Sequence, residues 1–366
     1  MTNSGMPRLL RAPLAALALL LAALVLAACG STKNDESSSS SGSSSSDSGS
    51  STATANPNAP IKKGLKTVSI PKQLGNPYEE TEHSGVDEAL KELGGSNRIQ
   101  GSTDAGASSQ VSIINSVAQQ KPDAIIIAGN DPNAVAPALK QAAKRGIKVV
   151  GMDSDVAPDA RSVFVNQTST QLIGEGQVKL IAKQIGGKGE IAILSATANA
   201  TNQNAWIEMM EATLAADHPD IKIVDTVYGD DDDQKSFDLT AALLADHPDL
   251  KGIISPTTVG VAAAARYLST SDAKGKVALT GLGTPNQMRD YVEDGTVTEF
   301  ALWNPGDLGY LAAFAAKALV HGDITGADGD TFTAGDLGDF TVGADATVLL
   351  GDPFKFNADN IGDFNF

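Results

Sequence analysis

The chain has little cysteine, tryptophan or histidine, and few basic residues for its size. Its 366 residues include one cysteine, two tryptophans and four histidines. A single cysteine excludes a disulfide within the chain. The 27 basic residues against 44 acidic ones give a formal net charge of −17. That balance argues against nucleic acid and against anionic lipid surfaces as partners, because both attract basic patches.

Motifs of common enzyme classes are also missing. No segment has the form G-x-S-x-G or H-E-x-x-H, and Gly186-Gly187-Lys188-Gly189 lacks the spacing of a phosphate-binding loop. The acidic run 230–233 lacks the spacing of a twelve-residue calcium loop, which favours a solvated turn that opens a helix. We therefore expect a protein that is not an enzyme and that uses no metal and no cofactor.

A long apolar segment without any charge lies near the N-terminus. Arg8 and Arg11 precede an uncharged apolar stretch at 12–28, and small residues precede Cys29. This order is typical of a secretory signal. It resembles the lipobox of bacterial lipoproteins, which implies that residues 1–28 are a signal peptide and that Cys29 carries lipid. The alternative is a plain transmembrane anchor, although about 17 residues is short for a span.

A serine-rich segment follows the cysteine. Eleven of the 14 residues from 37 to 50 are serine. Such a segment has too few apolar side chains to offset its ordering entropy, so residues 29–63 are predicted to be a flexible tether. We expect an extracytoplasmic protein that is lipid-anchored to the cell membrane, on the periplasmic or cell-wall side.

The rest of the chain alternates short apolar runs with longer amphipathic segments. This alternation predicts an α/β fold with mostly parallel sheets, and the length suits two domains. In such sheets ligands bind beyond the carboxyl ends of the strands. Strands are expected at 67–70, 124–127, 148–151, 190–194, 221–227, 252–254, 276–279 and 298–302, and helices at 79–93, 108–120, 134–145, 170–185, 203–216, 234–246, 259–268, 287–294 and 308–321.

Polar segments follow these strands, and their order along the chain resembles that of the sugar-binding proteins of bacterial ABC importers, most closely the rhamnose-binding and autoinducer-2-binding branch. The resemblance runs from about Lys66 to Phe364. It is carried by Ile70-Pro71-Lys72, Asn76-Pro77, Ala128-Gly129-Asn130-Asp131-Pro132, Met152-Asp153-Ser154-Asp155, Thr201-Asn202-Gln203-Asn204-Ala205-Trp206, Gly283-Thr284-Pro285-Asn286 and Leu302-Trp303-Asn304-Pro305.

The resemblance implies two similar Rossmann-like lobes of the type I periplasmic binding protein, joined by three crossover strands with the ligand in the cleft. Lobe 1 would comprise 64–166 and 304–326, and lobe 2 would comprise 167–303 and 327–366. The crossings would fall near 165–167, 303–305 and 322–329. The partners would be a monosaccharide, an ABC permease and its ATPase, and the protein is expected to be a monomer.

A sugar presents hydroxyls that both donate and accept, and apolar C–H faces. Planar polar groups and aromatic rings complement those features. Some candidates have a simpler explanation: Asp155 and Asn202 suit helix caps, and Trp206 and Trp303 suit the core. With those alternatives open, the predicted ligand-binding residues are Lys72, Asn76, Tyr78, Asp153, Asp155, Asn202, Gln203, Trp206, Pro256, Thr258 and Trp303.

The resemblance also bears on the ligand. Autoinducer-2 binders have an adjacent Asp-Gln pair and an alanine where this chain has Asn202-Gln203 and Thr258. The segments around Ile193–Asn204 and Thr280–Pro285 are more similar to rhamnose binders. L-rhamnose or a related deoxyhexose is therefore expected. Autoinducer-2 uptake, or a sugar sensor that feeds a membrane receptor, is the alternative.

Overall fold

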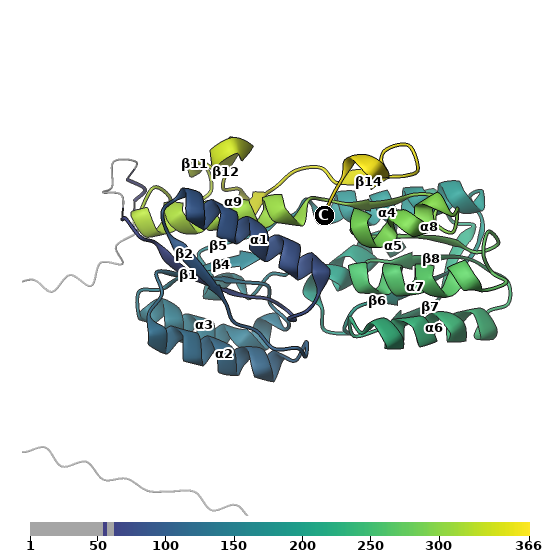
Figure 1. Ribbon diagram of the computed structural model, residues 1–366, viewed down its shortest axis with the longest axis horizontal. Coiled ribbons are helices and arrows are strands. Elements are labelled where there is room, and N and C mark those ends of the chain that lie inside the picture. The colour runs from purple at the N-terminus through teal and green to yellow at the C-terminus, as the bar shows by residue number, and fades with distance from the viewer. Residues whose placement is uncertain (1–53, 57–61) are drawn as a thin grey trace, which may run out of the picture. The chain divides into compact units, whose positions relative to one another are not determined.

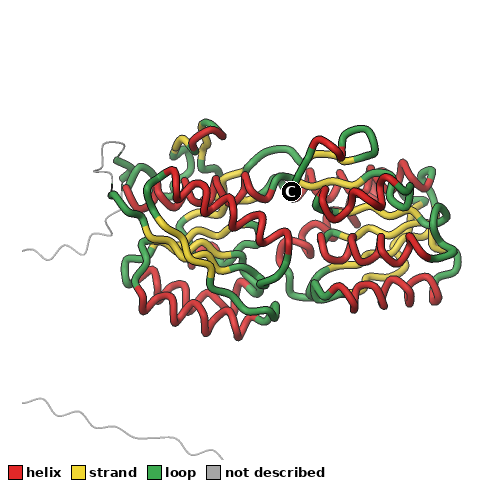
Figure 2. The backbone as a smooth tube through the Cα atoms, viewed as in Figure 1, coloured by secondary structure: helices red, strands yellow, loops and turns green. Residues whose placement is uncertain are grey.

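The structure is a computed structural model that describes residues 54–56 and 62–366. These residues belong to one compact unit, 52–366. The predicted signal peptide, the lipidated Cys29 and most of the predicted tether lie outside the described residues. The described part consists of two α/β lobes (Figures 1 and 2), as the alternation in the sequence predicts.

The first lobe is built on a six-stranded parallel sheet in the order β13-β5-β4-β3-β1-β2. Helices α1 and α9 pack together on one face of the sheet, and α2 packs with α3 on the other (Figure 1). The strands are β1 (Lys66–Ile70), β2 (Ser96–Ile99), β3 (Ala124–Ile127), β4 (Lys148–Met152), β5 (Val163–Asn166) and β13 (Thr347–Leu349); the helices are α1 (Pro77–Glu92), α2 (Ala107–Gln120), α3 (Pro132–Lys144) and α9 (Pro305–His321).

The second lobe is built on a four-stranded parallel sheet in the order β7-β6-β8-β9. Helix α4 packs with α5, and α6 packs with α7. The strands are β6 (Gly189–Ser195), β7 (Ile221–Tyr228), β8 (Leu250–Ser255) and β9 (Ala278–Gly281); the helices are α4 (Thr170–Ile185), α5 (Thr201–Asp217), α6 (Asp233–Asp246), α7 (Thr258–Thr270) and α8 (Pro285–Glu293).

Two antiparallel pairs complete the described strands. β10 (Phe300–Leu302) pairs with β14 (Phe354–Phe356), and β11 (Thr331–Thr333) pairs with β12 (Asp339–Thr341). Strand β2, with the sequence SNRI, is absent from the elements expected from the sequence. It is an edge strand whose side chains are mostly exposed, so its sequence lacks the apolar pattern that marks a buried strand.

Within residues 62–366 the chain crosses between the lobes three times. The first two crossings follow β5 and β10, close to their expected places. The third was expected near 322–329, and this placement is wrong. Strand β13 pairs with β5 in the first sheet, so the crossing lies between Leu349 and Phe354. The segment 322–329 instead forms a turn, because the carboxylate of Asp330 accepts hydrogen bonds from the backbone N–H groups of Thr325, Gly326 and Ala327.

Helices α1 and α9 approach each other at backbone contact. A Cβ atom added at Gly309 would lie 1.8 Å from the carbonyl oxygen of Glu82, and one at Gly85 would lie 1.9 Å from that of Gly306. Only glycine fits at such distances. This approach fixes the first turn of α1 beside the start of α9, and so holds Tyr78 close to Trp303.

Candidate functional site

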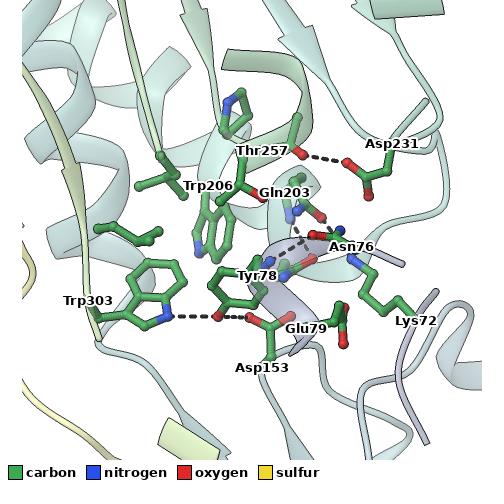
Figure 3. A pocket seen from close by; sticks show the side chains of 15 residues that line it. Lys72, Asn76, Tyr78, Glu79, Asp153, Gln203, Trp206, Asp231, Thr257 and Trp303 are labelled. Atoms are coloured by element: carbon green, nitrogen blue, oxygen red, sulfur yellow. Dashed lines mark hydrogen bonds between the residues drawn. The ribbon is translucent and has the colours of Figure 1, made fainter. Parts of the chain in front are cut away.

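A pocket of about 370 Å³ is lined by residues from both lobes. The lining residues follow β1 and β4 of the first lobe and β6, β7, β8 and β9 of the second, and Leu302 and Trp303 lie at the end of β10, where the chain crosses between the lobes (Figure 3). They are Lys72, Asn76, Tyr78, Glu79, Asp153, Asn202, Gln203, Trp206, Asp231, Pro256, Thr257, Thr258, Leu282, Leu302 and Trp303. All the residues expected from the sequence are among them except Asp155.

A chain of hydrogen bonds crosses the floor of this pocket. The indole nitrogen of Trp303 donates to the hydroxyl of Tyr78 at 2.7 Å, and that hydroxyl donates to Oδ1 of Asp153 at 2.8 Å (Figure 3). The amide of Gln167 also donates to Oδ1 of Asp153. Neither donor bonds to Oδ2, so this oxygen remains available to a ligand.

Asp153 adopts an unusual backbone conformation. Its φ of +59° lies in the left-handed region, which is uncommon for residues other than glycine. The backbone N–H of Asp153 donates to the carbonyl of Val165 at 3.2 Å. The side-chain amide of Gln167 donates to the backbone carbonyl of Asp153 at 3.1 Å. Strained backbone of this kind is concentrated at functional sites, where the surroundings hold it in place.

Two tryptophans and Tyr78 form an aromatic wall. The rings of Trp206 and Trp303 meet edge-to-face with centroids 5.9 Å apart, and Trp303 meets Tyr78 edge-to-face at 6.3 Å. Trp206 is 4% exposed and Trp303 is 2% exposed, so most of each ring lies in the core. Both residues also line the pocket, so their burial in the core is compatible with contact to a ligand.

Lys72 joins the two lobes across the pocket. Its Nζ donates to Oε1 of Gln203, on α5, at 3.4 Å. The Lys72 carbonyl accepts a hydrogen bond from the side chain of Asn130 at 3.0 Å, which fixes the loop after β1. Lys72 is buried, and its hydrocarbon stem is covered while its ammonium group reaches the lining.

Asn76 and Asn202 both use their amide oxygens locally. Asn76 caps α1 by accepting from the backbone N–H of Tyr78 at 3.0 Å, and Asn202 accepts from the N–H of Gln203 at 3.0 Å. Within the described residues neither amide nitrogen donates a hydrogen bond, so both can serve as donors to a ligand. Pro256 and Thr258 stand at the start of α7 and complete the lining of the second lobe.

Asp155 is the exception among the expected residues. Its carboxylate accepts two hydrogen bonds from the guanidinium of Arg161, at 2.6 and 2.8 Å, and it does not line the pocket. The Arg161 side chain is 2% exposed, so Asp155 neutralises a buried cation. Its proposed part in ligand binding is replaced by this structural pair.

Sequence reasoning missed five of the lining residues. Glu79 lies in the first turn of α1, where acidic residues are common for local reasons, and Asp231 lies in the run interpreted as a solvated turn. The structure places Asp231 at φ +51°, with its carboxylate bonded to the hydroxyl of Thr257. The only signal in the sequence was their position after a strand. Leu282 and Leu302 add apolar lining.

Two buried acidic groups of the lining, Asp153 and Glu79, have raised pKa values. Burial raises the pKa of Asp153, while Lys72, Tyr78 and Gln167 oppose that rise. Burial, with the nearby charge of Asp153, raises the pKa of Glu79 to about 8. Lys72 is the one basic side chain in the lining. A site with several carboxyl groups and one ammonium group suits a ligand rich in hydroxyls rather than an anion.

Within residues 54–56 and 62–366, no helix combines the length and the apolar character needed to cross a membrane. Over the same ranges, no three His, Cys, Asp or Glu side chains are grouped to hold a metal ion.

Three solved structures are similar to this chain over 82% of its length. A sugar ABC transporter from Actinomyces odontolyticus is 53% identical, with 98% of that chain covered and a TM-score of 0.68. A solute-binding protein of an ABC transporter from Clostridium phytofermentas, solved with bound L-rhamnose, is 40% identical, with 98% covered and a TM-score of 0.80. LsrB from Clostridium saccharobutylicum, in complex with AI-2, is 27% identical, with 100% covered and a TM-score of 0.77.

A family model agrees with these structural similarities. The model described as a periplasmic binding protein domain matches residues 68–324, which include both sheets apart from β13 and part of β1. The two lobes, the pocket between them and the match over most of the chain lead to one conclusion: this chain belongs to the periplasmic binding protein family.

Proposed function

We propose that this protein is the extracytoplasmic solute-binding protein of an ABC importer, and that it captures a monosaccharide, with L-rhamnose as the first candidate. The observation that carries the proposal is the pocket itself. Hydrogen-bonding groups and aromatic edges from both lobes meet there in a space of about 370 Å³. The 40% identity to a protein solved with L-rhamnose supports the choice of sugar.

In this proposal the ligand's hydroxyls replace water at named groups. Oδ2 of Asp153 accepts a hydroxyl hydrogen, and Lys72 donates to a sugar oxygen. The side-chain nitrogens of Asn76, Asn202 and Gln203 donate to hydroxyl oxygens, and Trp206 and Trp303 cover an apolar C–H face. Charge-assisted hydrogen bonds of this kind are roughly twice as strong as neutral ones. Micromolar affinity requires about 8 kcal/mol, which a few such bonds and one covered face can supply.

Lobe closure follows from the position of the pocket. A ligand that bonds to Asp153 in the first lobe and to Asn202 in the second binds the closed form more tightly than the open one. That difference in affinity shifts the population toward closure. The closed protein would then dock on a permease and its ATPase as a monomer.

Autoinducer-2 is the second candidate, supported by the similarity to LsrB in its AI-2 complex. The identity is lower than to the L-rhamnose complex, 27% against 40%. Asn202 and Thr258 also differ from the aspartate and the alanine that autoinducer-2 binders have at those positions. A sensor that passes the closed state to a membrane receptor would use the same pocket, and genes for a permease and ATPase beside this one would argue against it.

Calorimetric titration of the purified protein with L-rhamnose, and separately with autoinducer-2, tests the proposal. Saturable micromolar binding of L-rhamnose without binding of autoinducer-2 supports it. Binding of autoinducer-2 alone moves the function to signal uptake. If neither ligand binds, a panel of other monosaccharides follows, and failure of the whole panel contradicts the proposal.

We also propose that Cys29 carries a lipid anchor and that residues 30–63 act as a tether. The basis is the sequence alone, since these residues lie outside the described structure apart from 54–56, Lys62 and Lys63. Fractionation of cells that express the wild type and Cys29→Ser tests the anchor. The wild type should sediment with membranes and the variant should not; an unchanged distribution argues for a plain transmembrane anchor.

A further inference from the structure

Glu79 is the most unusual of the lining residues that sequence reasoning missed. It is 3% exposed, it lines the pocket, and its Oε2 is buried without a hydrogen-bond partner among the described residues. A buried polar atom without a partner is costly, because the group loses its water and gains nothing. In native structures such an atom calls for a specific explanation.

Helix capping does not account for Glu79. Asn76 is the cap of α1, so Glu79 stands at the third helical position, where a glutamate commonly bonds back to the backbone N–H of the cap residue. Within the described residues no hydrogen bond joins the Glu79 side chain to Asn76. Glu79 instead belongs to the pocket lining, and its side chain lies between those of Asp153 and Lys72 (Figure 3).

The hydrogen-bond donors around Asp153 favour its charged form, whereas the surroundings of Glu79 favour the neutral form. Asp153 accepts hydrogen bonds from Tyr78 and Gln167, and such donors stabilise a carboxylate. Glu79 faces Asp153 and Asp231 across the pocket and Glu82 on its own helix, with Lys72 as the opposing cation. One ammonium group cannot neutralise all of these carboxyl groups, so Glu79 and Glu82, which have fewer hydrogen-bond donors than Asp153, keep their protons.

We propose that Glu79 is a ligand-binding residue that acts in its neutral form and donates its carboxyl hydrogen to an oxygen of the bound sugar. This inference rests on the proposed sugar-binding function. A neutral carboxyl group offers one donor and an acceptor, which matches a sugar hydroxyl, and its donor also suits a ring oxygen that can only accept. The buried oxygen then gains in the complex the partner that it lacks in the free protein.

The protonation of Glu79 is consequently linked to binding. Burial, with the charges of Asp153 and Asp231, raises its pKa to about 8, while Lys72 and a backbone hydrogen bond oppose the rise. A bound sugar removes the remaining water and accepts the hydrogen, and both effects favour the protonated form further. Affinity should therefore stay constant below about pH 8 and fall above it, and binding at alkaline pH should take up a proton.

Calorimetry with L-rhamnose from pH 6.5 to 9 tests this on the wild type, Glu79→Gln and Glu80→Gln. Glu80 is the exposed neighbour of Glu79 on the same turn and provides the matched control. The wild type and Glu80→Gln should lose affinity by up to about tenfold per pH unit above pH 8. Glu79→Gln keeps an N–H donor without a titrating proton, so its affinity at pH 7 should lie within a few-fold of the wild type and stay flat.

Proton uptake gives a second measurement that needs no variant. Titrations of the wild type at pH 8.5, in two buffers with different ionisation enthalpies, should report uptake of up to about three quarters of a proton per sugar, because a group with a pKa of about 8 is about one quarter protonated at that pH before binding. If the wild type binds L-rhamnose without pH dependence or proton uptake, the proposed role of Glu79 is overturned and the proposed function stands. The same conclusion follows if the Glu79→Gln variant has the wild-type pH profile. Failure to bind any sugar at any pH overturns both.

Discussion

Trp303 donates a hydrogen bond of 2.7 Å to the hydroxyl of Tyr78, and this bond joins a crossing between the lobes to the floor of the pocket. Trp303 lies between β10 and α9, where the chain passes from the second lobe to the first. The hydroxyl of Tyr78 in turn donates a hydrogen bond to Asp153. Asp153, the carboxylate expected to bind the sugar, is therefore linked through Tyr78 to Trp303 at the crossing. Contact with a ligand and the arrangement of the lobes are expected to depend on the same side chains.

Replacing Tyr78 by phenylalanine should weaken sugar binding and destabilise the fold. The change removes a donor to Asp153 and leaves the Trp303 N–H buried without its acceptor. An unsatisfied buried group costs about 1–3 kcal/mol. Urea unfolding should show a loss in that range, and calorimetry should show weaker affinity for the sugar. Wild-type values in both measurements would contradict the hydrogen-bonded chain.

Asp153 and Asp155 should behave oppositely although they are two residues apart. Asp153→Ala should weaken sugar binding at least tenfold and leave the protein folded, because the carboxylate lies on the pocket. Asp155→Ala should leave the affinity for the sugar within a few-fold of the wild type. It should destabilise the protein by about 3 kcal/mol, because it leaves the buried guanidinium of Arg161 without its counter-ion. Calorimetry and urea unfolding of both variants check this. Loss of binding in Asp155→Ala at unchanged stability would restore it as a ligand-binding residue.

Gly309→Ala should be strongly destabilising. The added methyl group would lie 1.8 Å from the carbonyl oxygen of Glu82, so α1 and α9 must separate. Overpacking of this kind typically costs about 1–3 kcal/mol. Gly176→Ala, on α4, is the matched control because a Cβ there meets nothing within 4 Å and alanine favours a helix, so it should stabilise by about 0.5–1 kcal/mol. Equal stability of the two variants would argue against the close approach.

Glu82→Gln should change how stability depends on pH. Glu82 is buried with neither carboxyl oxygen bonded among the described residues, and burial with the charges of Asp153 and Glu79 raises its pKa well above 4.5. The folded state then holds a proton that the unfolded state releases above pH 4.5. The unfolding free energy therefore falls as pH rises from 4.5 through the raised pKa, by at most about 1.4 kcal/mol per pH unit for this group.

Urea unfolding from pH 6.5 to 8 tests that dependence, in a range above the pKa of His83, which burial lowers to about 4. The fall in stability should be smaller in Glu82→Gln than in the wild type, since glutamine carries no proton to lose. Glu88→Gln, an exposed change on the same helix, should keep the wild-type slope. The same slope in all three proteins would show that Glu82 is ionised in the folded state.

The sequence by itself predicted the α/β fold and most of the pocket. Alternating apolar runs and amphipathic segments mark strands and helices locally, and parallel strands bring their carboxyl ends to one edge. Lys72, Asp153, Gln203 and Pro256 follow four different strands, and each lies in the pocket because of that rule. The predicted signal peptide and lipidated Cys29 are likewise sequence inferences, and they stay predictions.

Only the tertiary structure decided which of several similar residues reach the pocket. Asp153 and Asp155 flank one serine, yet Arg161 neutralises Asp155, while Asp153 lies in the pocket lining. Glu79 and Asp231 look like ordinary residues at helix starts until the two lobes meet around them. The third crossing was misplaced for the same reason, since β13 joins β5 through contacts far apart in the chain. Local sequence sets propensity, whereas burial and charge pairing depend on neighbours that the fold supplies.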